Sequence, residues 1–277
     1  MEHEPHSEVE GRFRLMLVRR LIAACATLVT IFALAACRGG EGTHTARYDV
    51  TARYPHDPGA YTEGLVWGDG VLFESTGLNA GSDVRRVDLK TGRVLASRAL
   101  AANRFGEGLT LLKGRLYQLT WKDSVAYTYD PATLTPDDSF HYAGEGWGLT
   151  TDGTNLIMSD GSDSLRVYSP DFQLQRVLHV RYHDTPLQQL NELEYVRGEV
   201  LANVYRTNWV MRIDPSTGVA REAIDFGDLY PDRPVSADVM NGIAIAPDGQ
   251  QLLLTGKQWP VLFQVRLHPV PAGGAGR

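Results

Sequence analysis

The chain has 277 residues, of which 43% are hydrophobic and 22% are charged, and its formal net charge at pH 7 is −6. This composition is typical of a globular protein with a sizeable core, and the 28 glycines favour a fold with many turns. The negative net charge and the lack of a basic stripe argue against a nucleic-acid-binding surface, so we expect no nucleic acid among its partners.

The first element along the chain is a predicted targeting segment. Arg19 and Arg20 precede an apolar, uncharged stretch at 21–36, which ends at Cys37. A basic start followed by an apolar run too short to span a membrane comfortably is typical of a secretory signal peptide. The tetrad at 34–37 also resembles a bacterial lipobox, in which the cysteine carries the lipid and becomes the mature N-terminus. We therefore expect export and a lipid anchor at Cys37.

This interpretation divides the chain into a lipoprotein signal peptide (1–36), a lipidated tether (37–47), a main folded domain (48–268) and a flexible tail (269–277). Cys25 would leave with the signal peptide, so the mature domain would have no free thiol for a disulfide or a metal site. Arg38 stands where an aspartate often retains lipoproteins at the inner membrane, so we expect the periplasmic face of the outer membrane. The alternative is a retained single anchor with Cys37 as an ordinary residue. Met16 is an alternative start.

After the tether, a short motif recurs five times: an acidic or amide residue, usually a glycine, and then an apolar residue. The copies are Glu63-Gly64-Leu65, Glu107-Gly108-Leu109, Glu145-Gly146-Trp147-Gly148-Leu149, Asn191-Glu192-Leu193-Glu194 and Asn241-Gly242-Ile243-Ala244. Each copy is followed by a glycine-containing turn signal and a short apolar run, which together predict a β-hairpin. Periods of about 40 to 50 residues indicate propeller blades.

Two further strands are predicted in each repeat, because Asp-Pro or Thr-Gly signals follow a third apolar run. Four short strands in each of five repeats, without helical periodicity, favour an all-β fold, a five-bladed β-propeller. Residues 48–54 precede the first motif, so we expect them to add the outer strand of the last blade beside 262–267 and to close the ring. The stretches 182–190 and 228–238 are predicted loops.

Equivalent positions of the blades face the central channel, so the motif places several polar groups around one axis. The candidates are Glu63, Glu107, Glu145, Asn191, Glu192 and Asn241, with Trp121, Trp147, Tyr205 and Lys257 from neighbouring segments. The alternative for each motif residue is structural, because a buried carboxylate or amide can satisfy backbone N–H groups between blades.

Several chemistries lack their sequence signals. The chain has no Gly-x-Ser-x-Gly elbow, no histidine pair at zinc-ligand spacing, no phosphate-binding glycine loop and no dinucleotide fingerprint. The eight histidines are scattered. The sequence therefore supports neither a metal-dependent nor a histidine-based mechanism.

Two segments, 105–110 (Phe-Gly-Glu-Gly-Leu-Thr) and 144–150 (Gly-Glu-Gly-Trp-Gly-Leu-Thr), resemble the glutaminyl-peptide cyclotransferase family of plants and bacteria. The likeness continues in order through 55–58, 74–77, 118–121, 158–162, 190–195, 201–204, 241–244 and 255–260. It extends from about Tyr48 to Leu267. Each block is weak by itself, whereas the ordered set is specific.

The resemblance implies a five-bladed propeller in which the substrate's α-amine attacks its own γ-carboxamide, forming pyroglutamate from N-terminal glutamine without a cofactor. Glu107 matches the family's proposed proton shuttle. Asn191 and Lys257 match positions thought to hold the carboxamide and the developing charge. Trp121 and Trp147, with Phe105, would form the pocket walls.

Two residues depart from the family pattern. Glu63 stands where the family usually has glutamine, which puts a titratable carboxyl among the substrate-binding positions and would weaken activity or shift its pH range. Tyr205 stands where the family often has tryptophan, which keeps an aromatic wall but makes it smaller and would shift substrate preference.

Two other functions remain open from the residues alone. A calcium-dependent, lactonase-like propeller would use the oxygen atoms of Glu63, Glu107 and Asn191 as ligands, although the aromatic residues and Lys257 argue against it. A lipid-anchored envelope scaffold without catalysis is the second alternative, because a fold does not fix a function.

Overall fold

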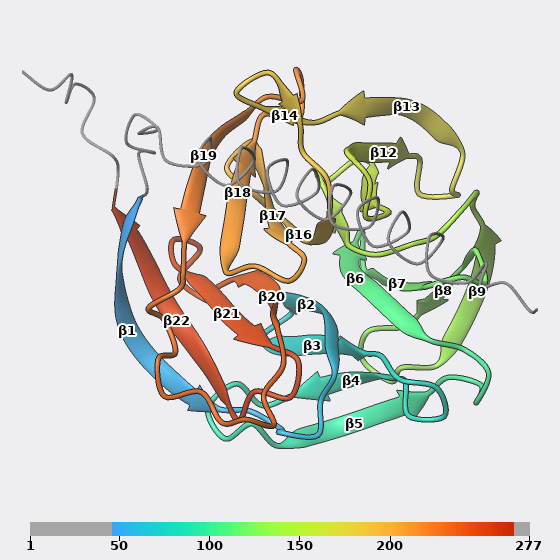
Figure 1. The fold of residues 1–277 in the computed structure, drawn as a ribbon. Helices are drawn as coiled ribbons and strands as arrows, with labels where there is room; N and C mark the ends of the chain where they lie inside the picture. Colours follow the sequence, from blue (N-terminus) through green and yellow to red (C-terminus); the bar gives the residue numbers. More distant parts are fainter. Residues whose placement is uncertain (1–45, 269–277) are drawn as a thin grey trace, which may run out of the picture. The chain divides into compact units, whose positions relative to one another are not determined.

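The computed structural model describes residues 46–268, and within this range every regular element is a β-strand. Five four-stranded antiparallel sheets are arranged around a central axis, so the predicted five-bladed propeller is confirmed (Figure 1). Among the described residues no helix is long and apolar enough to cross a membrane. The predictions for 1–36, for Cys37 and the tether up to residue 45, and for the tail at 269–277 lie outside the described residues.

Each blade runs from an inner strand at the channel to an outer strand at the rim. Blade 1 contains β2 (Thr62–Gly68), β3 (Val71–Thr76), β4 (Asp83–Val87) and β5 (Val94–Ala99), and blade 2 contains β6 (Gly106–Leu112), β7 (Arg115–Thr120), β8 (Val125–Tyr129) and β9 (Pro136–His141). Blade 3 contains β10 (Leu149–Thr151), β11 (Leu156–Ser159), β12 (Ser164–Tyr168) and β13 (Leu174–His179). Blade 4 contains β16 (Leu190–Val196), β17 (Glu199–Val204), β18 (Trp209–Ile213) and β19 (Ala220–Asp225).

Blade 5 closes the ring with strands from both ends of the described chain. It contains β20 (Met240–Ile245), β21 (Leu252–Gly256), β22 (Val261–His268) and, as its outer strand, β1 (Arg47–Pro55). Tyr48 pairs with Leu267 and Tyr54 with Leu262, as the sequence predicts. The pairing covers the edge of β22 that would otherwise be open. Because β1 leads directly into blade 1, it also links the last blade to the first.

The glycine of the repeated motif has a packing reason. A Cβ atom on Gly64 would lie 2.5 Å from the backbone nitrogen of Leu109 in the next blade, and Cβ atoms on Gly108 and Gly148 would also collide with the backbone of the following blade. The inner strands therefore approach one another more closely than any side chain permits. The residue before each of these glycines, Glu63, Glu107 or Trp147, lines the pocket at the channel.

The apolar core lies between successive blades. Val66 and Phe73 of blade 1, for example, pack with Leu109 and Leu116 of blade 2. The inner strands are buried along most of their length, whereas an outer strand such as β5 is largely exposed. Inter-blade packing of this kind makes the channel a rigid support for side chains at its mouth.

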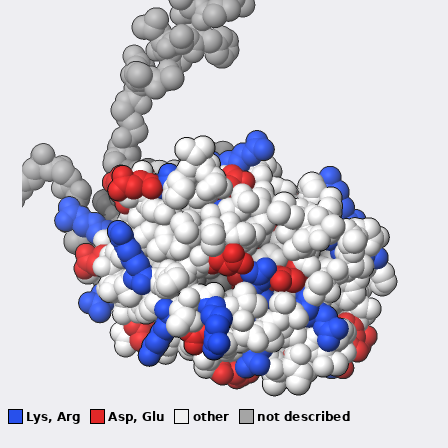
Figure 2. Space-filling view, turned by 90° about the horizontal axis from the view of Figure 1, so that it is seen from below, with Lys and Arg blue, Asp and Glu red and all other residues white. Residues whose placement is uncertain are grey.

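Two details concern the loops and the surface. The stretch 182–190, predicted as a loop, contributes to a short hairpin of β14 (Arg181–Tyr182) and β15 (Thr185–Pro186), while 228–238 has no strand, as expected. On the face shown in Figure 2, basic and acidic side chains are interspersed and form no continuous basic stripe. That face offers no extended positive surface of the kind that binds nucleic acid.

Candidate active site

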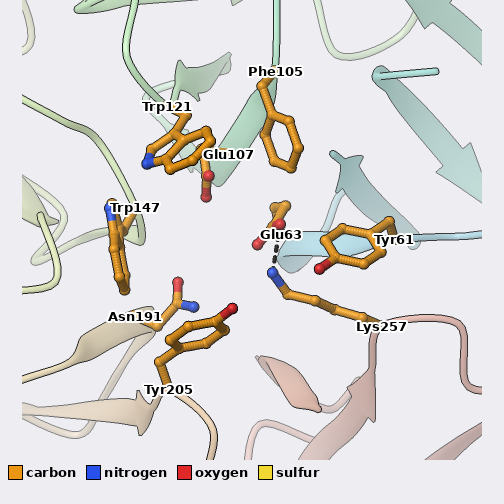
Figure 3. A pocket seen from close by; sticks show the side chains of 9 residues that line it. All are labelled: Tyr61, Glu63, Phe105, Glu107, Trp121, Trp147, Asn191, Tyr205 and Lys257. Atoms are coloured by element: carbon orange, nitrogen blue, oxygen red, sulfur yellow. Dashed lines mark hydrogen bonds and ion pairs between the residues drawn. The ribbon is translucent and has the colours of Figure 1, made fainter. Parts of the chain in front are cut away.

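A pocket opens at one end of the channel, where the inner strands begin. It is lined by Tyr61, Glu63, Phe105, Glu107, Trp121, Trp147, Asn191, Tyr205 and Lys257 (Figure 3). The structure thus brings together all eight pocket residues singled out in the sequence; their roles stay predictions. Tyr61 was missed, although it stands two residues before Glu63 just as Phe105 stands two residues before Glu107.

The strand register shows which residues are equivalent in the five blades. Leu65, Leu109, Leu149, Leu193 and Ile243 pair at the same position of their hairpins. The residues two positions earlier are Glu63, Glu107, Trp147, Asn191 and Asn241. The third copy of the motif therefore begins at Trp147 and not at Glu145. Two glycines, Gly146 and Gly148, precede β10, and the sequence analysis matched the first of them to the motif instead of the second.

Lys257 and Glu63 form a buried ion pair. Lys257 Nζ lies 2.5 Å from Glu63 Oε1, and Asn241 Nδ2 donates a hydrogen bond of 3.2 Å to Glu63 Oε2. Burial raises the pKa of Glu63 to about 7, although the charge of Lys257 opposes the shift. Burial alone would lower the pKa of Lys257, but the nearby carboxylates of Glu63 and Glu107 raise it. Lys257 is therefore an ammonium group at neutral pH.

Glu107 is almost as deeply buried, but no cationic side chain of the described residues is in direct contact with it. Burial, followed by the charge of Glu63, raises its pKa well above the ordinary value of a glutamate. Its side chain points into the pocket opposite Asn191 and makes no hydrogen bond to another described residue (Figure 3). The carboxyl group therefore retains its proton to higher pH than an ordinary glutamate and has free hydrogen-bonding capacity toward a ligand.

Asn191 provides an acceptor without a partner. The residue is 3% exposed, and its Oδ1 atom has no hydrogen-bond partner among the described residues. Its backbone oxygen accepts a hydrogen bond of 2.7 Å from Ser159 Oγ, which fixes the main chain at this point. Buried polar atoms are normally paired, so an unpaired amide oxygen in a pocket is well suited to accept a ligand N–H group.

The aromatic walls are held at fixed angles. Trp121 Nε1 and Trp147 Nε1 both donate to Glu145 Oε2, over 2.7 Å and 3.0 Å. Phe105 packs edge-on against Trp121, and Tyr205 packs edge-on against Trp147, each with ring centroids 5.6 Å apart. Glu145 itself does not line the pocket, so its contribution is to orient the two indole rings.

The remaining candidates, Glu192 and Asn241, have structural partners. Glu192 is fully buried and accepts hydrogen bonds from the backbone N–H groups of Leu65 and Ile243, in blades 1 and 5. Asn241 Nδ2 donates to Thr62 O over 3.0 Å in addition to Glu63. Glu192 therefore fits the structural alternative, in which a buried carboxyl group satisfies backbone N–H groups of other blades.

The site offers little to a calcium ion. Among residues 46–268 no group of three histidine, cysteine, aspartate or glutamate side chains is arranged to hold a metal. The ammonium group of Lys257 already contacts Glu63, one of the three oxygen ligands that the calcium alternative requires, and would repel a cation there.

Comparisons with known proteins agree with one another. A sequence model of the glutamine cyclotransferase family matches residues 21–267. The chain is 43% identical over 233 residues to a glutaminyl-peptide cyclotransferase of Arabidopsis thaliana, covering 81% of this chain and 72% of that protein. It also superimposes on the crystal structure of Myxococcus xanthus glutaminyl cyclase with a TM-score of 0.75 and 34% identity, covering 82% of this chain and 98% of the other.

Proposed function

Since the chain belongs to the glutamine cyclotransferase family, we infer that it is a glutaminyl-peptide cyclotransferase, which converts the N-terminal glutamine of a peptide to pyroglutamate and releases ammonia. The main structural support for this function is that Glu107, Asn191 and Lys257 line the same aromatic pocket.

The reaction requires little beyond positioning and proton transfer. The α-amine attacks the δ-carbon of its own side chain, a C–N bond closes the five-membered ring, and the bond to the carboxamide nitrogen breaks. One proton must leave the ring nitrogen and one must reach the departing nitrogen, which leaves as ammonia. Because both groups belong to one molecule, holding the side chain folded supplies much of the rate acceleration.

We assign both proton transfers to Glu107. A protonated carboxyl group has one donor and one acceptor oxygen. In this state Glu107 donates its proton to the departing nitrogen and accepts the proton of the ring nitrogen, so it ends the cycle as it began. The raised pKa of Glu107, caused first by burial and then by Glu63, suits this use because it keeps the carboxyl group protonated closer to the pH range in which the substrate amine is neutral.

Lys257 and Asn191 bind the two ends of the carboxamide. The ammonium of Lys257 stabilises the negative charge that develops on the carboxamide oxygen. Asn191 Oδ1 accepts a hydrogen bond from the carboxamide nitrogen and so orients it toward Glu107. The rings of Phe105, Trp121 and Trp147 exclude water, which strengthens both interactions.

The test is ammonia release from a short peptide with N-terminal glutamine, with EDTA present. We expect turnover by the purified protein and none from the same peptide with an N-terminal asparagine, whose shorter side chain would need a four-membered ring. A folded protein that releases no ammonia from any glutamine peptide would contradict the function and favour the scaffold alternative. Loss of turnover in EDTA would favour a metal-dependent reaction.

We also propose that the protein is exported and anchored by lipid at Cys37 on the periplasmic face of the bacterial envelope, in the outer membrane. The support is the sequence of 19–37, with its basic start, apolar stretch and lipobox-like tetrad. Labelling with a fatty-acid analogue should mark the wild type and spare Cys37→Ala. Unlabelled wild type or a cytoplasmic location would contradict the anchor.

A further inference from the structure

A second buried ion pair lies beside the pocket without lining it. His56 and Glu74 are 6% and 1% exposed, and His56 Nε2 is 2.9 Å from Glu74 Oε1. The other ring nitrogen, Nδ1, is 2.6 Å from the backbone oxygen of Trp259. Neither residue is among the residues that line the pocket.

The hydrogen-bond partners fix the protonation of this pair. A backbone oxygen can only accept, so His56 Nδ1 must carry a proton. Glu74 Oε1 also accepts a hydrogen bond of 2.8 Å from Thr62 Oγ1, which favours a carboxylate. Burial opposes the charged forms, but their mutual attraction raises the pKa of His56 and lowers that of Glu74. The hydrogen bonds therefore fit an imidazolium facing a carboxylate, and His56 keeps its second ring proton to higher pH than an ordinary histidine.

The other charged groups around the pair favour the same state. Arg85 Nη1 is 4.0 Å from Glu74 Oε2, and Arg85 is in turn bound by Asp57 and Asp83. Asp57 also raises the pKa of His56 through its charge. The uncharged hydroxyl of Thr255 lies 3.4 Å from His56 Nδ1 and donates to Val261 O, so its oxygen can only accept from Nδ1.

The pair crosses the seam between blade 5 and blade 1. His56 follows β1 and Trp259 lies between β21 and β22, both in blade 5, while Glu74 and Thr62 belong to blade 1. The active-site pair crosses the same seam, with Lys257 from blade 5 and Glu63 from blade 1. Thr62 directly precedes Glu63, and Trp259 follows Lys257 by two residues in a tight turn closed by Trp259 N donating to Gly256 O.

We propose that the His56–Glu74 pair is a positioning device for catalysis: it holds the side-chain hydroxyl of Thr62 and the backbone oxygen of Trp259, and so sets the distance between Glu63 and Lys257 in the pocket. The proposal rests on the proposed function for its effect on catalysis. It assigns His56 no contact with the substrate. The pair acts on the rate only through the placement of Lys257 and Glu63.

The test is His56→Gln in the purified full chain, with His179→Gln as the matched control. His179 also faces a carboxylate, Asp163 at 3.4 Å, but its side chain is 73% exposed and is not among those that line the pocket. Because small displacements of catalytic groups are costly, we expect kcat to fall about tenfold in His56→Gln with little change in KM. The control should keep wild-type kcat.

A second measurement does not depend on activity. The carboxyl carbon of Glu63, labelled with ¹³C and assigned by its loss in Glu63→Gln, reports the midpoint of its ionisation. If the pair sets the Glu63–Lys257 distance, His56→Gln weakens that ion pair and the midpoint moves to higher pH. An unchanged midpoint, together with unchanged kcat in folded protein, would overturn the proposal even if the melting temperature fell.

The test of the positioning role can fail independently of the test of the proposed function. A folded wild type without ammonia release contradicts the proposed function, whereas the ¹³C midpoint still decides the positioning role. If His56→Gln does not fold, Thr62→Val takes its place, because it removes only the hydroxyl that donates to Glu74 and keeps the side-chain shape. A Thr62→Val variant with wild-type kcat and wild-type Glu63 midpoint would then overturn the proposal.

Discussion

Glu107 and Glu192 are two buried channel carboxyl groups with opposite surroundings. Both have a pKa raised well above the ordinary value, in each case chiefly by burial. Glu192 binds the backbone N–H groups of Leu65 and Ile243, whereas Glu107 contacts no donor among the described residues and faces the pocket.

The difference teaches that a perturbed carboxyl group is not sufficient evidence of a catalytic residue. Structural groups inside a protein also have shifted pKa values. What separates the two residues is whether the hydrogen-bonding capacity is already used and whether a ligand can reach it. By this criterion Glu107 and Asn191 belong to the site, and Glu192 belongs to the framework.

The largest difference in turnover is expected between two single variants, Glu107→Gln and Glu192→Gln. Glu107→Gln removes the proton shuttle, so turnover should fall on the order of 10²-fold or more while the fold is kept. Glu192→Gln should keep turnover but lower the free energy of unfolding by about 1–3 kcal/mol, because one backbone N–H loses its acceptor. Ammonia release and urea denaturation measure the two quantities. Near wild-type turnover in Glu107→Gln, or lost turnover in folded Glu192→Gln, would break the comparison.

Replacing Lys257 comes next. Lys257→Met removes the cation that stabilises the developing oxyanion, so kcat should fall about 10²-fold. It also leaves Glu63 buried without its partner, which should destabilise the fold. Adding Glu63→Gln should recover the stability and not the rate, as seen by combining thermal melting with steady-state kinetics. Recovery of the rate in the double variant would show that Lys257 only neutralises Glu63.

The unpaired amide oxygen of Asn191 predicts a smaller effect. Asn191→Leu keeps the volume but removes the acceptor for the carboxamide nitrogen, so kcat/KM should fall about tenfold, the value of one to two hydrogen bonds. Because the Oδ1 atom has no hydrogen-bond partner within residues 46–268, the variant should be no less stable than the wild type. A clear loss of stability with unchanged kcat/KM would instead place Asn191 in the framework with Glu192.

The sequence predicted the fold and most of the pocket because the propeller repeats a local pattern. Hairpin turns and a glycine at each inner strand are encoded by neighbouring residues, so the five blades could be counted directly. The closing strand β1 was also predictable, since apolar and polar residues alternate along 48–54 and this segment precedes the first motif.

Other features depend on contacts between segments far apart in the chain. Glu145 and Trp147 lie two residues apart, and only the hairpin register shows which of them faces the channel. Tyr61 was predictable by analogy with Phe105. The pairing of His56 with Glu74 was not predictable, because it forms only when blade 5 packs against blade 1.

The smallest effect, and the most specific to this chain, concerns the pH dependence set by Glu63. Because burial raises its pKa to about 7 from an ordinary 4.5, the folded protein holds this proton more tightly than the unfolded chain. The wild type should therefore lose stability relative to Glu63→Gln as pH rises from about 4.5 to about 7, with no further change above that.

The same ionisation should appear in the kinetics. Above about pH 7 the Glu63 carboxylate engages the ammonium of Lys257 at 2.5 Å and competes with the developing oxyanion. Glu63→Gln removes this competitor, so we expect kcat/KM to rise a few fold, roughly one kcal/mol or less in transition-state free energy, at pH 8 and to match the wild type near pH 6. Profiles of kcat/KM against pH for both proteins measure this directly. Parallel profiles would show that Glu63 does not ionise in the working range, and the carboxyl group would then belong with Glu192, buried and without influence on the chemistry.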